Sequence, residues 1–407
     1  MGEWISGALG DLVELKRGYD LPKKNRQSGP YPLVSSSGTT DYQAEAKVEG
    51  PGVITGRYGT IGEVFYVTDD FWPLNTTLYV RDFKGNDPRF LSYFLRSVNF
   101  MAYSDKAAVP GLNRNHLHLA PIYYPTSIDE QRNLASLLGA LDDKIELNRQ
   151  TNETLEALAR TIFKDWFVDF GPTRAKAEGH SAYLVPEMWE LFPDALDDED
   201  KPVGWDTEPI HDQAEWVNGA AYKNMHFSDT PDALPVVKIA ELKAGVTDRT
   251  QFTNTHLGEK YRIDSGELLF SWSGNPDTSI DVFIWQYGPA WLNQHIFAVR
   301  DAGKMSKPQL YFMLKTYMPE FAEIARNKQT TGLGHVTKAD MQRMMICTSS
   351  KAVRDRFDDL IKPIFDRLVA NLFESRELAT MRDLLLPKLM SGEIRLREAE
   401  KLVDAVA

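Results

Sequence analysis

The chain aligns with itself, and this duplication constrains its fold more than any single motif does. Trp4 to Gly18 matches Trp205 to Gly219. Further pairs follow in the same order: Gly52–Gly56 with Gly266–Phe270, Leu74–Asn75 with Leu292–Asn293, Leu91–Arg96 with Leu310–Lys315, and Leu112–Ile122 with Val336–Ile346. Because order and apolar pattern are kept, the 407 residues are predicted to hold two copies of one module.

The first part of each copy has the pattern of β-strands. Residues 52–67 alternate β-branched and aromatic residues around glycines, which predicts two strands joined by a turn. Residues 267–272, 282–287 and 296–300 have the same pattern in the second copy. A short helix is predicted after the strands in each copy, at 88–97 and at 307–316.

The second part of each copy is predicted to be one long helix, over residues 128–170 and 350–391. Ser127 is the expected N-cap of the first helix, and Pro363 is expected to weaken or kink the second. Apolar residues at alternating spacings of about four and three form a coiled-coil seam in each helix, with a polar centre that includes Asn148 and Asn152. The principal seam residues are Leu134, Leu141, Ile145, Leu155, Phe357, Ile364, Leu378 and Leu385. The apolar seam of each helix should span about 39 residues, or roughly 58 Å at 1.5 Å per residue.

Two such helices in one chain can bury their apolar stripes on each other. We therefore predict an α+β fold: two β-rich domains separated by two long antiparallel coiled-coil helices, in an internal pseudo-two-fold repeat. The expected parts are a first β-rich domain at 1–127, helices at 128–170 and 350–391, a linker at 171–204, a second β-rich domain at 205–349, and a tail at 392–407.

Composition narrows the class of protein. One cysteine, Cys347, forms neither an intramolecular disulfide nor a cysteine zinc cage, and no apolar run is long enough to span a bilayer, so a cytoplasmic protein is expected. The net charge of −12 does not itself favour nucleic acid, although residues 1–127 hold as many basic as acidic residues. Walker A, Rossmann and hydrolase nucleophile signatures are missing from the sequence.

The ordered motifs resemble those of the specificity subunits of Type I restriction-modification enzymes. They are Gly59-Thr60-Ile61-Gly62, Leu74-Asn75, Asp129-Glu130-Gln131-Arg132, Leu141–Ile145 followed by Asn148, and Leu384–Ile394 with its Leu-Pro-Lys-Leu and Ser-Gly-Glu-Ile steps. The second copy departs from the pattern at Ser273–Pro276 and Val353–Asp355. Those departures fit a second domain that reads a different DNA sequence.

The resemblance implies a DNA-binding, non-catalytic subunit of a restriction system that acts in DNA modification. Each β-rich domain would be a target recognition domain that reads one half of a bipartite, asymmetric double-stranded DNA target. The helices would be spacers that dock two methyltransferase (modification) subunits, with restriction (translocase and endonuclease) subunits joining them. S-adenosylmethionine, ATP and Mg²⁺ would belong to those partners, and this chain would hold neither a cofactor nor a metal.

Polar and basic residues on predicted loops are the candidate DNA contacts, because Lys and Arg bind phosphates while Arg and Asn read base edges. In the first copy they are Lys23, Lys24, Asn25, Arg26, Ser36, Arg57, Tyr58, Thr60, Lys106, Asn113 and Arg114. In the second copy they are Tyr222, Lys223, Asn224, Trp272, Asn275, Lys328, Gln329 and His335.

Two alternatives stay open at this stage. Asp232, Glu241 and Lys243 have the loose spacing of a Mg²⁺-dependent nuclease motif, which would make the chain a stand-alone nuclease. The helices could also belong to a coiled-coil scaffold without a DNA role.

Overall fold

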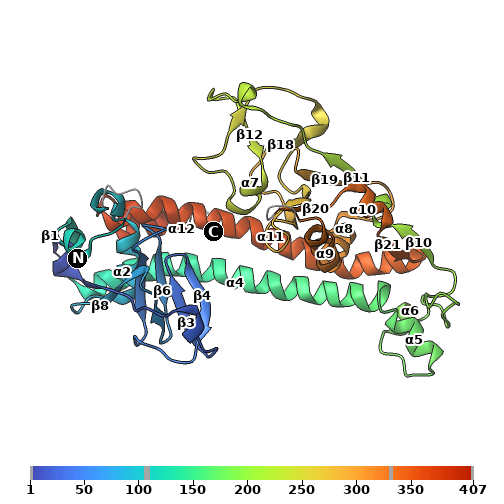
Figure 1. Cartoon of the computed structure of the whole chain (residues 1–407), viewed down its shortest axis with the longest axis horizontal. Helices are drawn as coiled ribbons and strands as arrows, with labels where there is room; N and C mark the ends of the chain where they lie inside the picture. The colour runs from blue at the N-terminus through green and yellow to red at the C-terminus, as the bar shows by residue number, and fades with distance from the viewer. Residues whose placement is uncertain (1–2, 105–110, 330–332, 405–407) are drawn as a thin grey trace. The chain divides into compact units, whose positions relative to one another are not determined.

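A computed structural model of the chain describes residues 3–104, 111–329 and 333–404. Its contacts divide the chain into unit 1, made of Met1–Glu146 and Ser375–Ala407, and unit 2, made of Leu147–Glu374. The two longest elements are α4 (Ile128–Phe167) and α11 (Lys351–Met390) (Figure 1). Each of these helices is divided between the two units. The units are described separately below.

Unit 1 contains a four-stranded sheet in the order β2-β8-β5-β6. It also contains a three-stranded sheet, β4-β3-β7, and the two-stranded sheet β1-β9. Its strands are β1 (Trp4–Ala8), β2 (Glu14–Arg17), β3 (Tyr31–Ser35), β4 (Gly38–Gln43), β5 (Gly52–Gly56), β6 (Val64–Val67), β7 (Trp72–Pro73), β8 (Thr77–Asp82) and β9 (Pro121–Pro125). Its helices besides the long ones are α1 (Leu9–Leu12), η1 (Lys23–Asn25), α2 (Pro88–Arg96), η2 (Phe100–Tyr103), α3 (Arg114–His118) and α12 (Leu396–Asp404).

Unit 2 contains the matching four-stranded sheet β11-β19-β15-β17, a second four-stranded sheet β13-β12-β18-β14, and the pairs β10-β21 and β16-β20. Its strands are β10 (Asp206–Pro209), β11 (Ala214–Asn218), β12 (Leu234–Val237), β13 (Phe252–Thr253), β14 (Arg262–Ile263), β15 (Leu268–Ser271), β16 (Ser273–Gly274), β17 (Asp281–Ile284), β18 (Ala290–Leu292), β19 (Ile296–Asp301), β20 (Gly334–His335) and β21 (Met345–Thr348). Its shorter helices are α5 (Gly171–Ala177), α6 (Pro186–Trp189), η3 (Ile210–Gln213), η4 (Asn224–His226), α7 (Ile239–Ala244), η5 (Glu259–Tyr261), α8 (Lys307–Thr316), α9 (Met318–Asn327) and α10 (Lys338–Arg343).

The predicted α+β fold with two β-rich parts and two long helices is confirmed. The hairpin expected at 52–67 is the β5–β6 pair, and the strands expected in the second copy are β15, β17 and β19. The two short predicted helices are α2 and α8. Local chemistry starts both: Asp87 caps α2 by accepting from the Phe90 N–H at 2.9 Å, and Ser306 caps α8 by accepting from the Gln309 N–H.

The two long helices pair within each unit and run antiparallel there. In unit 1 the core joins Leu134, Leu138 and Leu141 of α4 to Leu385 and Leu389 of α11. In unit 2 the core joins Ala159 and Phe163 of α4 to Phe357 and Ile361 of α11. Of the predicted seam, Leu134, Leu141, Phe357 and Leu385 are buried, while Ile145, Leu155, Ile364 and Leu378 are half-buried.

The centre of the paired helices is polar, as the seam pattern predicts. In unit 2 the Asn148 side chain donates to Glu374 at 2.8 Å, and the Asn371 side chain donates to Asn152 at 2.9 Å. Asn152 in turn donates to the Leu368 carbonyl at 3.1 Å. Because these amides find partners only when the helices are aligned in one way, they select the register of the pair.

Pro363 does not interrupt α11, which is one helix from Lys351 to Met390. Pro363 is an exposed residue of this helix. Its missing N–H leaves the carbonyl of Asp359, also an exposed residue, without its usual partner. Water can satisfy that carbonyl on the exposed side of the helix, so the cost of the proline is tolerated there.

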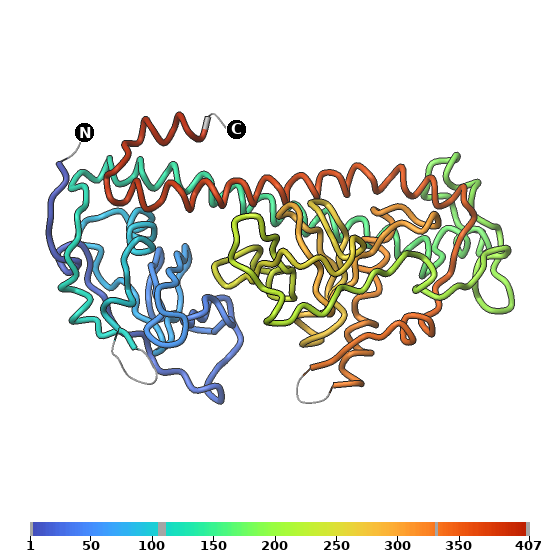
Figure 2. The backbone as a smooth tube through the Cα atoms, turned by 90° about the horizontal axis from the view of Figure 1, so that it is seen from above, coloured from blue at the N-terminus to red at the C-terminus, as the bar shows by residue number. Residues whose placement is uncertain are grey.

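Both ends of the helix pair carry further packed segments. The stretch expected as a linker, 171–204, contains α5 and α6, and its Phe192 is buried against Trp166 and Trp205 with ring centroids 5.0 and 6.3 Å away. After α11 the chain reverses at Gly392, which has a φ of +74°, and α12 folds back with Ala399 in the core of unit 1 (Figure 2). No helix in the described ranges is both long and apolar enough to cross a membrane.

An ionic cluster fixes α2 to both long helices in unit 1. The Asp142 carboxylate accepts from Arg382 at 2.7 Å, from the Tyr93 hydroxyl at 2.7 Å and from Arg96 at 3.2 Å. Burial alone would raise the pKa of Asp142, but the Arg382 and Tyr93 hydrogen bonds outweigh it, and the pKa lies below its usual value. The cluster therefore stabilises the charged carboxylate.

We expect Asp142→Ala to lower the free energy of unfolding by about 1–3 kcal/mol, because three donors lose a partly buried acceptor. Since the folded pKa is depressed, this stabilisation is complete above the unfolded value of about 3.9 and is lost as pH falls through the lower folded pKa. Urea unfolding of wild type and variant at neutral and acid pH measures the loss of stability and its dependence on pH. Asp129→Ala, whose carboxylate is 85% exposed, is the control and should change little. Equal effects of the two variants would contradict the role given to Asp142.

Candidate nucleic-acid interface

A hollow of about 340 Å³ opens on the surface of unit 1. Most of the residues that line it are cationic or polar, and two are leucines. They are Arg17, Arg57, Tyr58, Leu78, Leu112, Asn113, Arg114 and Asn115. The sequence prediction contained Arg57, Tyr58, Asn113 and Arg114 from two distant segments. The fold brings these four together.

Backbone hydrogen bonds between distant segments build the hollow. Arg57, which follows the last residue of β5, donates its N–H to the Thr76 carbonyl at 2.8 Å. The Arg57 carbonyl accepts from the Leu112 N–H at 3.0 Å, and Tyr58 bridges to Gly111. Gly111 is required here, because a Cβ at this position would lie 2.4 Å from the Tyr58 ring. The loop before α3 is thus held against the end of β5.

The charges in this hollow are poorly compensated by the protein. The Arg57 guanidinium lies over the Tyr58 ring, 4.6 Å from its centroid. Arg17 lies 3.5 Å from Asp20, and both side chains are largely exposed. Within the part of the chain that the structure describes, Arg57 and Arg114 form no ion pair. Three guanidiniums around an open hollow favour an anionic or acceptor-rich ligand.

Arg17 was missed by the sequence prediction. It is the last residue of β2, and its register partner in β8 is Leu78, which also lines the hollow. The one sequence feature that could have indicated Arg17 as a site residue is its position directly before Gly18 and Tyr19, at the end of the strand that the repeat identifies. That signal is weak in sequence, because an arginine at a strand end is common on any surface.

The remaining predicted residues of unit 1 lie outside the hollow lining. Lys23, Lys24 and Asn25 form the exposed turn η1, and Arg26 follows it, 3.8 Å from Asp41. Thr60 donates to the Ser36 carbonyl, which joins the two loops that carry these residues. Lys106 lies outside the described residues.

The predicted residues of unit 2 occupy different environments. Tyr222 is buried, 6.5 Å from the Trp291 ring centroid, and burial raises its pKa to about 12. Exposed positions are Lys223 and Asn224 at η4, Asn275, and Gln329, while Trp272 and His335 are half-buried. The Asn275 side chain accepts from the Asp277 N–H at 2.9 Å, which orders its turn.

Comparison with known proteins shows what the chain resembles. Residues 1–157 match the family model described as the Type I restriction modification DNA specificity domain. The Type I restriction enzyme MjaIX specificity subunit of Methanocaldococcus jannaschii is 26% identical over 339 residues, which cover 80% of this chain and 74% of that protein. The HindI specificity subunit of Haemophilus influenzae is 25% identical over 315 residues, covering 65% of this chain and 67% of that protein.

A solved structure agrees with the fold. The S subunit of a Type I restriction-modification system from M. genitalium superposes with a TM-score of 0.56 at 14% identity, covering 95% of this chain and 96% of that chain. The chain is thus similar in sequence to Type I restriction enzyme specificity subunits and similar in fold to one S subunit. This similarity supports a non-catalytic role in sequence recognition over the nuclease and scaffold alternatives.

The residues of the alternative nuclease motif form structural hydrogen bonds. The buried Glu241 carboxylate accepts from the Lys238 N–H at 3.0 Å and from the Thr250 hydroxyl at 3.2 Å, which caps α7. Asp232 accepts from the Asn254 side chain at 3.2 Å. In residues 3–104, 111–329 and 333–404, no three His, Cys, Asp or Glu side chains are grouped to hold a metal ion.

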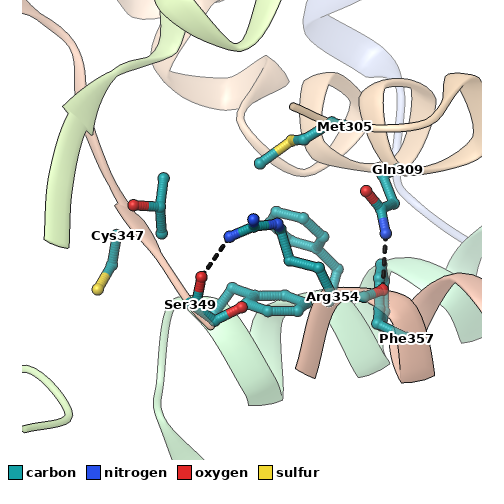
Figure 3. Close-up of a pocket in the computed structure, with 9 residues that line it drawn as sticks. Met305, Gln309, Cys347, Ser349, Arg354 and Phe357 are labelled. Atoms are coloured by element: carbon teal, nitrogen blue, oxygen red, sulfur yellow. Dashed lines mark hydrogen bonds between the residues drawn. The ribbon is translucent and has the colours of Figure 1, made fainter. Parts of the chain in front are cut away.

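A small pocket lies in unit 2 beside Cys347, as Figure 3 shows. Its volume of about 10 Å³ accommodates no more than one water molecule. Phe163, Met305 and Phe357 line it, and the Gln309 side chain donates to the Arg354 carbonyl at 2.7 Å across its wall. Burial raises the pKa of Cys347 to about 11, so its thiol is protonated and unreactive at neutral pH. The cavity is a packing feature of the core.

Lys328, a predicted DNA contact, is paired with a carboxylate of its own chain. Its Nζ lies 2.5 Å from both oxygens of Asp340, a carboxylate that is almost fully buried. Burial would raise the pKa of Asp340, but hydrogen bonds from Lys328, Thr337 and Arg343 hold it well below its usual value. Lys328 thus neutralises a buried charge.

We expect Lys328→Ala to lower the free energy of unfolding by about 1–3 kcal/mol, because the buried Asp340 carboxylate loses its principal donor. Thermal unfolding measures this. Lys351→Ala, whose side chain is 80% exposed, is the matched control and should shift stability by less than about 0.5 kcal/mol. A variant that keeps its melting temperature but loses DNA affinity would show instead that Lys328 contacts DNA.

Proposed function

We propose that this chain is the DNA-reading subunit of a Type I restriction-modification complex and that it binds a bipartite, asymmetric double-stranded target. The hollow of unit 1 is the observation that carries the proposal. It gathers Arg17, Arg57 and Arg114 with side-chain amides, and among the described residues Arg57 and Arg114 lack a carboxylate partner. Such a surface suits a polyanion whose grooves display hydrogen-bond acceptors.

Arg114 and Arg57 of the hollow differ in exposure, and we assign them different DNA contacts. Arg114 is exposed at the start of α3, where its guanidinium can bind a phosphate without reading sequence. Arg57 is half-buried and rests on Tyr58, so it is oriented before binding and is suited to a base edge. The β-rich part of unit 2 would read the other half of the target. The two halves are expected to differ, because the side chains of the two parts differ.

The catalytic chemistry would belong to partner subunits. Two methyltransferase subunits would dock on the long helices and bring S-adenosylmethionine, and restriction subunits would bring ATP and Mg²⁺. Leu147 and Leu158, which are 56% and 50% exposed, lie three helical turns apart on the same face of α4 in unit 2. Exposed leucines in this arrangement are typical of a docking face. The acidic net charge of −12 is consistent with partners that supply part of the grip on DNA in the cytoplasm.

Methylome sequencing of cells that carry this chain with its methyltransferase tests the proposal directly. We expect a methylated adenine motif split into two unequal halves. A contiguous motif, or the same methylome with and without this chain, would overturn the proposal.

Replacement of Arg57 and replacement of Arg114 should affect DNA binding in different ways. Arg114→Ala is expected to weaken binding to all DNA sequences and to lower the slope of log K against log salt by about 0.9, the value for one phosphate. Arg57→Ala should relax the preference at one base pair at a cost of about 1–3 kcal/mol. Binding of the complex to its methylated motif and to single-base variants, measured between about 50 and 200 mM salt, separates the two effects.

Arg132→Ala is the matched control, because Arg132 is 64% exposed on α4 and does not line the hollow. If Arg132→Ala reduced affinity as strongly as either hollow variant, the binding effects would reflect general charge, and the assignment of the hollow would be lost.

Leu147→Glu with Leu158→Glu should reduce co-purification of the methyltransferase at least ten-fold, corresponding to about 1.4 kcal/mol, while the chain stays folded. Both side chains are exposed, so the core is unaffected. Ala244→Glu, an exposed position on α7, is the control that adds a carboxylate elsewhere in unit 2. Wild-type yields of complex from the double variant would contradict docking at this face.

A further inference from the structure

Unit 2 contains a site equivalent to the hollow of unit 1, and backbone contacts define the equivalence. The Leu112 N–H donates to the Arg57 carbonyl at 3.0 Å in unit 1, and the Val336 N–H donates to the Trp272 carbonyl at 2.8 Å in unit 2. Arg57 in turn donates to Thr76, and Trp272 donates to His295. Trp272 therefore occupies the place of Arg57.

Strand register extends the match to the neighbouring positions. Arg17 pairs with Leu78 between β2 and β8, and Asn218 pairs with Phe297 between β11 and β19. The next residue of each strand confirms the alignment, because Gly18 donates to Thr77 at 3.1 Å and Gly219 donates to Ile296 at 3.0 Å. Asn218 thus stands where unit 1 has Arg17.

The third position follows from the helices α3 and α10. Asn113 caps α3 and Thr337 caps α10, each by accepting a backbone N–H of the first turn. The first helical residues are then Arg114 and Lys338. The positions of the three guanidinium groups in unit 1 are therefore occupied in unit 2 by the amide of Asn218, the indole of Trp272 and the ammonium group of Lys338.

The indole of Trp272 is braced in one orientation. Its Nε1 donates to the Asn218 Oδ1 at 2.9 Å, and its ring lies 5.3 Å from the His295 ring and 5.9 Å from the Phe297 ring. The Lys338 Nζ lies 5.9 Å from the Phe297 ring centroid. Since the Asn218 oxygen is occupied by the indole, its amino group is left to donate outward from an exposed side chain.

We propose that Trp272 and Asn218 determine the specificity of unit 2 by recognising an A·T base pair. This inference rests on the proposed DNA-reading function. The indole edge supplies the apolar contact that the thymine methyl group requires, and the Asn218 amino group donates to the thymine O4 or adenine N7 acceptor. At the equivalent place in unit 1, the Arg57 guanidinium favours guanine, which presents O6 and N7 acceptors together. Equivalent positions thus read different bases.

The test exchanges the two chemistries in the whole complex. Trp272→Arg places the residue of unit 1 in unit 2 and should change one base pair of the methylated motif, within the half read by unit 2 only. Asn218→Ala should leave the motif recognisable but reduce discrimination at that base pair by about 5- to 150-fold, equivalent to about 1–3 kcal/mol. Methylome sequencing reads the motif, and competition binding with single-base variants of it measures discrimination.

Controls keep each outcome decisive. Trp272→Phe retains an aromatic edge and should retain the preference for A·T, and Met225→Ala, which removes an 83% exposed side chain, should change nothing. Because Trp272 packs on Phe297, its arginine variant can fail to fold, and Asn218→Ala at an exposed position then decides the question. A folded complex in which Trp272→Arg and Asn218→Ala leave both half-sites and their discrimination unchanged overturns this inference alone. A wild-type complex that binds no DNA overturns the proposed function with it.

Discussion

Each unit depends on the burial of one long helix against the other. In unit 1 Leu138 of α4 and Leu389 of α11 are fully buried in the same core, and in unit 2 Phe163 and Phe357 pack with ring centroids 5.7 Å apart. An isolated helix of 40 residues would expose this stripe to water. The strands and short helices complete the same two cores, since Phe94 of α2 and Phe312 of α8 belong to them. The β-rich part of each unit therefore shares its core with the helix pair.

Hydrophobic burial alone would allow the two helices to slide, because leucine and phenylalanine pack in many registers. The polar groups at the centre of the pair remove that freedom. Asn371 is only 1% exposed and donates to Asn152, so a shifted register would leave a buried amide without its partner. The structure accepts less hydrophobic burial at this point in return for a unique alignment.

Much of the fold could be predicted from the sequence, because duplication and helical periodicity are properties of the chain itself. The extents of α8 and the β5–β6 hairpin follow from cap residues and alternating patterns. The sequence does not show which face of the helix Pro363 occupies, and the effect of the proline depends on that face. The candidate site could be predicted only in part from the sequence. Arg57 and Arg114 are far apart in sequence, and their proximity in the fold depends on the hydrogen bond between the backbones of Leu112 and Arg57. The ion pair between Lys328 and Asp340 could not be predicted, because the buried position of Asp340 leaves no local pattern in the sequence.

The division of the chain between the units has a consequence for its synthesis. Unit 2 is one uninterrupted stretch, Leu147–Glu374, whereas unit 1 is assembled from both ends of the chain. The core of unit 1 needs Leu385, Leu389 and Ala399, which are translated after unit 2. The strands of residues 1–146 are therefore synthesised before unit 2 but complete their core after it, and their apolar surface stays exposed in the nascent chain until then. Premature termination after residue 374 would deprive those strands of this part of their core and spare unit 2.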